Sequence, residues 1–192
     1  MLAHAALTLR TIGFAAALCT ASLLVASASA EDPPAMPDSI PPLLAESLTP
    51  ILRDWIVQSR DAAVAQGVER IPGAIRAALH GYVPDDILDR VRWRVGGAGE
   101  MTLQQNLFRF GYAPAVTLDH VVVFERESDA LNDPKLWAHE LKHVMQYAEW
   151  GVTDFAARYL RDYEAVEKEA AEYRWEWMKL TDRGPKVAGT AQ

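Results

Sequence analysis

Cysteine is almost absent from this chain: Cys19 is the only one among 192 residues. It lies in an apolar stretch near the N-terminus and follows Leu18, where a lipid-attachment motif needs a smaller residue. Lipidation is therefore not expected. If the stretch is removed on export, the remaining chain has no thiol and can form no disulfide, although an exported compartment would permit one.

Basic residues are also scarce, with 19 against 26 acidic ones and a net charge of −7. The first thirty residues contain Arg10 and no acid, so their removal makes the chain more acidic. An acidic chain has no electrostatic attraction for a phosphate backbone or for anionic lipid. We therefore expect neither nucleic acid nor a membrane surface as a partner. No internal repeat is present.

Long hydrophobic runs are confined to the N-terminus. Arg10 is followed by an apolar run over residues 12–26 and by Ala28-Ser29-Ala30, a small-residue cleavage pattern. These features predict a signal peptide over residues 1–30. The run is short for a transmembrane helix. We expect an exported protein, periplasmic or secreted, with no stable membrane insertion after cleavage; a retained anchor is the alternative.

The rest of the chain is long enough for one domain. Residues 31–42 are rich in proline and are expected to form an extended leader. Residues 43–182 are expected to form a single domain, with N-terminal helices over 43–83 and a core region over 84–182. Residues 183–192 are expected to be a flexible tail.

Hydrophobic periodicity predicts an α+β fold, mainly helical, with a small β-sheet beside the central helix. Pro50 is expected to start or kink the first helix, and Asp119-His120 to form a turn between two strands. His120 is considered as an additional functional-site residue, but a position in a surface turn is the favoured role. The predicted helices cover residues 43–66, 72–80, 84–90, 101–108 and 134–150, followed by one or two helices over 153–180 that include the helix over 166–180. The predicted strands cover 91–95, 115–118 and 121–124.

The segment His139-Glu140-Leu141-Lys142-His143 reads H-E-x-x-H. On a helix, residues four apart stand on one face, so His139 and His143 can direct their imidazoles at one metal ion. Glu140 lies at the edge of the same site, where its carboxylate can take a proton from a zinc-activated water. Imidazole and carboxylate ligands with an open position are typical of hydrolytic Zn²⁺ sites.

The surroundings favour a metal site over a chance match. Asp133 suits the N-cap of a helix that begins at Pro134 and is expected to stop at Gly151. Lys135, Lys142 and Glu149 fall on one narrow strip of this helix, the expected solvent face. The two histidines lie on the opposite, largely apolar side. Buried imidazoles without a partner are costly, and a metal ion would satisfy them.

A third ligand is expected downstream, where no further histidine occurs. In the helix predicted over 166–180, Glu167 falls within the apolar stripe, whereas most of the other acids fall outside it. Glu167 is therefore the acid expected to face inward and to complete the coordination. The alternative is an ion pair between Glu167 and Arg174, which lies on nearly the same face.

Residues 138–146 read A-H-E-L-K-H-V-M-Q, and Glu167-Lys-Glu-Ala170 follows. The chain thereby resembles gluzincin metallopeptidases and, more closely, the eCIS core domain, a predicted metallopeptidase domain associated with bacterial extracellular contractile injection systems and toxins. The resemblance covers about residues 84–177. It implies that the single domain over 43–182 is zincin-like, with the catalytic core of a metallopeptidase over 84–182, and that Glu167 is the third zinc ligand. Ala171 departs from it, since many gluzincins have an aspartate there that orients a ligand histidine. That hydrogen bond must come from another residue or be absent.

A strand and a tyrosine near the two helices are candidates for further roles. The resemblance implies a strand edge beside the zinc that pairs with an extended peptide, and residues 117–124 are the candidate edge. Aromatic residues around the two helices are expected to be mostly core. Tyr163 lies one helical turn before Glu167 and is the candidate hydrogen-bond donor to a developing oxyanion, with core packing as its alternative.

The sequence predicts an exported zinc-dependent hydrolase, a metallopeptidase acting on a peptide or protein substrate. Zn²⁺ would be held by His139, His143 and Glu167, with Glu140 as the general base. The alternative is a non-catalytic zinc-containing binding or adaptor module of the cell envelope or of a secretion or toxin system, which Ala171 favours slightly. A zinc hydrolase with a non-peptide envelope substrate is a third hypothesis.

Overall fold

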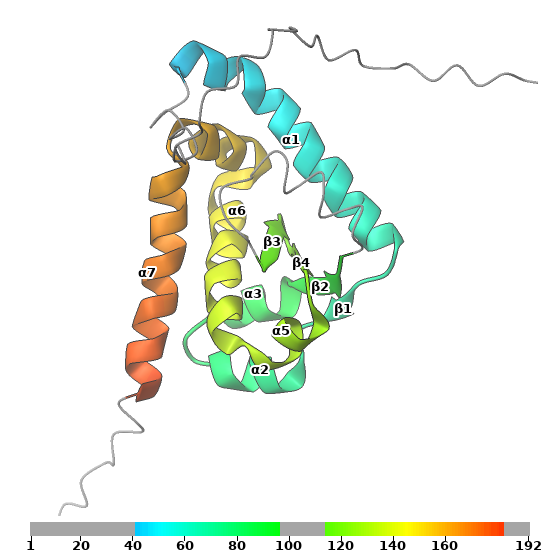
Figure 1. Ribbon diagram of the computed structural model, residues 1–192, viewed down its shortest axis with the longest axis vertical. Helices are drawn as coiled ribbons and strands as arrows, with labels where there is room; N and C mark the ends of the chain where they lie inside the picture. Colours follow the sequence, from blue (N-terminus) through cyan, green and yellow to red (C-terminus); the bar gives the residue numbers. More distant parts are fainter. Residues whose placement is uncertain (1–40, 97–113, 183–192) are drawn as a thin grey trace, which may run out of the picture. The chain divides into compact units, whose positions relative to one another are not determined.

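The computed structural model describes residues 41–96 and 114–182 (Figure 1). The predicted signal peptide over 1–30, the leader up to residue 40, the helix over 101–108 and the tail over 183–192 lie outside the described residues. Within them the chain is mainly helical with one small sheet, which confirms the predicted α+β class. None of the helices in these two ranges has both the length and the apolarity that a membrane span needs.

The elements follow the predicted order closely. Two short ones were not predicted, β1 and α5, because two and six residues are too few to show a periodicity. Pro50 lies inside the first helix rather than at its start. The elements are α1 (Pro42–Ala65), β1 (Glu69–Arg70), α2 (Gly73–Leu79), α3 (Asp85–Arg90), β2 (Arg92–Val95), β3 (Ala115–Leu118), β4 (Val121–Phe124), α5 (Glu127–Asn132), α6 (Pro134–Arg161) and α7 (Tyr163–Asp182).

The sheet has the strand order β1-β2-β4-β3. β4 pairs in parallel with β2 and antiparallel with β3, so β4 is an interior strand and β3 lies at the end of the described sheet. The candidate substrate edge over 117–124 is therefore wrong for β4, and its β3 part stays a prediction. All four residues of β4 are buried, as expected for a continuous apolar run in a strand covered on both faces.

The two faces of β4 enter two hydrophobic clusters, since successive side chains of a strand point to opposite sides. Val122 and Phe124 pack in a cluster around Trp137, with residues from α2, α3, α5 and α6. Val123 packs on the other side with Ile56 of α1 and with residues of α6 beyond the H-E-x-x-H motif. The sheet is thus held between helices, with α6 contributing to both clusters.

α6 begins as the sequence predicts. The Asp133 carboxylate oxygen Oδ1 accepts hydrogen bonds from the backbone N–H groups of Lys135 and Leu136, each at 3.0 Å, and Pro134 occupies the first turn. Gly151 has φ 74° and ψ 161°, so the helix is kinked there and then resumes. The predicted stop is therefore a bend, and the helix beyond it runs to Arg161.

Gly151→Ala is expected to lower the free energy of unfolding by about 1–3 kcal/mol, because this backbone region is almost restricted to glycine. No described atom lies within 4 Å of the position that a Cβ would take, so the loss would reflect backbone strain rather than a clash. Gly73→Ala is the matched control: its surroundings are equally open and its φ is not positive. Urea unfolding of both variants measures the effect, and equal stabilities would contradict the strain.

Candidate metal centre

The H-E-x-x-H motif lies in the first part of α6, beside α7 (Figure 1). The Nε2 atoms of His139 and His143 are 3.2 Å apart, and the two rings are nearly perpendicular at 82°. Their four-residue spacing on a regular helix brings the imidazoles together, as predicted. His143 is buried, and the His139 side chain is 17% exposed, so one side of the pair is open to a small ligand.

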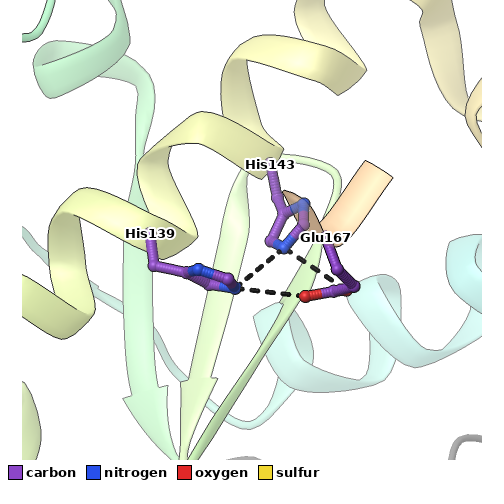
Figure 2. A group of neighbouring side chains, drawn as sticks. All are labelled: His139, His143 and Glu167. Carbon is purple, nitrogen blue, oxygen red and sulfur yellow. Dashed lines mark hydrogen bonds and ion pairs between the residues drawn. The ribbon is translucent and has the colours of Figure 1, made fainter. Parts of the chain in front are cut away.

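Glu167 of α7 points its carboxylate at the same two nitrogens (Figure 2). Its Oε2 lies 3.3 Å from the Nε2 of His139, and its Oε1 lies 3.6 Å from the Nε2 of His143. The three residues form a group that could hold a metal ion. No ion pair joins Glu167 to Arg174 in the described part of the chain, so the structure does not support that alternative.

The spacing of these atoms fits a small tetrahedral cation. Metal–ligand bonds of about 2.0–2.1 Å at tetrahedral angles place neighbouring ligand atoms about 3.3–3.4 Å apart. The three observed separations are 3.2, 3.3 and 3.6 Å. The first joins the two imidazole nitrogens, and the other two join these nitrogens to different oxygens of the Glu167 carboxylate. The two imidazoles and the carboxylate therefore surround one position, and the residues fit the implied metal.

The carboxylate of Glu167 and the imidazole of His143 shift each other's pKa. Burial alone would raise the pKa of Glu167, but hydrogen bonds and charge interactions with His139 and His143 hold that pKa well below its usual range. Burial would lower the pKa of His143, and the neighbouring carboxylates of Glu167 and Glu140 raise it instead. An ionised carboxylate thus faces the two imidazoles, which is the state that a cation requires.

The Glu140 residue is 4% exposed, so its carboxylate is buried and not in solvent. Its Oε2 accepts a hydrogen bond of 2.7 Å from the hydroxyl of Thr117 on β3. Because Thr117 has this one hydroxyl proton, the bond fixes one carboxylate oxygen and leaves Oε1 to face another group. The sequence pointed to the strand of Thr117 but not to this contact, which depends on how β3 packs against α6.

Tyr159 is one of the aromatic residues around the two helices, which are expected to be mostly core, and it contacts the cluster. Its hydroxyl donates a hydrogen bond of 3.1 Å to Oε1 of Glu167. Burial, followed by the charge of Glu167, raises the pKa of Tyr159, so the phenol keeps its proton. Tyr163 is 39% exposed and its ring lies 6.3 Å from that of Tyr159. Its role as an oxyanion donor stays a prediction.

Gln146 is a buried neighbour of the second histidine. It is fully buried, and its Oε1 lies 2.8 Å from Nδ1 of His143. By contrast, the buried Nδ1 of His139 has no hydrogen-bond partner among the described residues.

His120 lies in the β3–β4 turn, as expected for a turn residue. Its Nδ1 is 3.0 Å from the carboxylate of Asp119, which also binds Arg60 at 2.9 Å. Asp119 has φ 57°, a left-handed conformation that aspartate tolerates in turns. His120 contacts Asp119 rather than any of the three candidate ligands.

Comparison with known families identifies one segment. Residues 70–151 match the family model of the eCIS core domain, which confirms the resemblance to that domain. The match includes the whole H-E-x-x-H motif and ends at Gly151, so Glu167 lies beyond it. No curated protein and no solved structure matched the chain.

Proposed function

Since residues 70–151 match the eCIS core domain, we propose that the chain is an exported zinc-dependent metallopeptidase of an extracellular contractile injection system or a related toxin. The observation that carries the proposal is the convergence of His139, His143 and Glu167 on one point between α6 and α7. The family match supports the setting, and the ligand geometry supports the chemistry.

Zinc is the proposed ion because of the donor set. Structural zinc sites commonly use four protein ligands, often thiolates, whereas catalytic sites use three and leave one position open. The cluster has two imidazoles and one carboxylate, and the only thiol of the sequence is Cys19. When bound, zinc supplies a Lewis acid that lowers the pKa of water and polarises a carbonyl group.

Glu140 is proposed as the general base. Its side chain is anchored through Oε2 by Thr117, so that Oε1 can accept the proton of the attacking water. The same carboxyl group would then deliver that proton to the leaving amine. Tyr159 would hold the Glu167 carboxylate in place through its hydrogen bond, and Tyr163 is the candidate donor to the oxyanion.

A peptide is the proposed substrate because β3 ends the described sheet next to the base. β3 pairs with β4 on one side, and its residue Thr117 contacts Glu140. An extended peptide added to the outer side of β3 would pass the base within a few residues. Strand addition of this kind recognises the backbone of any extended chain.

The proposal is tested by zinc loading and peptide cleavage. The purified protein is stripped with a chelator, reloaded, and analysed for metal by mass spectrometry, and a peptide library is then digested with both forms. We expect one zinc ion per chain and cleavage only by the loaded form. Failure to take up zinc would refute the proposal, and zinc uptake without any cleavage would support the adaptor alternative.

A further inference from the structure

We infer that Gln146 is a positioning residue that selects the metal-binding tautomer of His143 and ties it to α7. This inference rests on the proposed zinc site and adds a residue to it.

The amide of Gln146 can be oriented in only one way. Its Nε2 lies 3.2 Å from the backbone carbonyl oxygen of Val166 and 3.1 Å from Oε2 of Glu169. A carbonyl and a carboxylate only accept hydrogen bonds, so both require the NH₂ group at that end. The reversed amide would place its oxygen against two acceptors in a buried site, which is costly.

The amide orientation then fixes the tautomer of His143. The Oε1 of Gln146 faces Nδ1 of His143 at 2.8 Å and can only accept, so Nδ1 must carry the hydrogen. In a neutral imidazole, Nε2 is then the atom with the lone pair. Nε2 is the nitrogen that points at His139 and Glu167 (Figure 2). The amide therefore stabilises the form of His143 that can bind a cation.

The same amide also positions α7. Val166 directly precedes Glu167, so the bond from Gln146 to its carbonyl fixes the helix beside the third ligand. Lys142 of α6 adds a second link, since its Nζ lies 3.3 Å from Oε2 of Glu169. The bond from Gln146 to the Val166 carbonyl is buried, so water does not compete for it. One side chain thus aligns two of the three ligands.

The first experiment measures the tautomer in the metal-free chain. Long-range ¹H–¹⁵N NMR at about pH 9, where an ordinary imidazole is neutral, distinguishes the two forms of each histidine. We expect His143 with its hydrogen on Nδ1 in the wild type, and a mixture of forms in Gln146→Leu. A wild-type His143 protonated on Nε2 would overturn the inference. This readout requires neither zinc nor activity, so it stands apart from the proposed function.

The second experiment measures zinc affinity by competition with a chromophoric chelator. Gln146→Leu should weaken binding by about 10–100-fold, the usual effect of removing a residue that orients a metal ligand. Gln58→Leu, the same change at an exposed position of α1, should leave affinity unchanged. Wild-type affinity in Gln146→Leu would overturn the inference. Absence of zinc binding by the wild type would instead refute the proposed function. If Gln146→Leu fails to fold, the tautomer of His143 in the wild-type protein still tests the inference.

Discussion

Glu140→Gln is expected to reduce peptide hydrolysis by about 10²–10⁴-fold while the protein keeps its zinc. The loss is the usual contribution of a positioned general base. Retention of zinc is expected because Glu140 is not one of the three converging ligands. Glutamine has nearly the same shape, and its carbonyl oxygen can still accept the hydrogen bond from Thr117. The substitution therefore removes the base and little else.

The measurement is kcat on the best peptide from the library, together with zinc content by mass spectrometry. Glu149→Gln is the matched control, since it makes the same chemical change at an exposed position of α6 and should leave kcat unchanged. Full activity in Glu140→Gln would refute the general-base role. Loss of zinc in this variant would show instead that Glu140 supports the metal site.

His143→Ala is expected to weaken zinc binding by about 10²–10³-fold. Zinc sites in small domains bind with about 10–16 kcal/mol, and removing one of three or four ligands costs about 3–4 kcal/mol of this. The substitution also removes the partner of the buried Gln146 oxygen Oε1 and one of the partners of the Glu167 carboxylate. We therefore expect a larger effect than that of Gln146→Leu, in which all three ligands remain.

Zinc affinity is measured by chelator competition, and the rise in melting temperature on zinc addition gives an independent readout, because a ligand stabilises the folded state it binds. His80→Ala is the control: the His80 side chain is 65% exposed and lies outside the cluster. An unchanged affinity in His143→Ala would exclude His143 as a ligand. A zinc-dependent melting shift of wild-type size in the variant would do the same.

The features that could be predicted from the sequence are those that depend on local residue patterns. The start of α6 follows from Asp133 and Pro134, and the pairing of His139 with His143 follows from helix geometry alone. Glu167 could be predicted to face α6 because the apolar stripe of its own helix shows which side is inward. The identity of these residues as ligands stays a prediction.

The contacts that surround the cluster could not be read from the sequence, because they depend on how distant elements pack. Tyr159 reaches Glu167 only because the helix bends at Gly151, and a stop signal does not tell a bend from an end. Thr117 reaches Glu140 because β3 lies against α6. The same holds for the interior position of β4, which is set by its pairing with β2.

The position of Glu167 has a consequence for the stability of a chain whose only cysteine is Cys19. An ion held by His143 and Glu167 would close a loop of about 24 residues that contains the bend at Gly151. Such a cross-link restricts the unfolded chain as a disulfide does, and a disulfide over a loop of this size contributes about 3 kcal/mol. The metal centre would thus be a reversible cross-link between α6 and α7. A chelator would remove it, whereas a reductant would not.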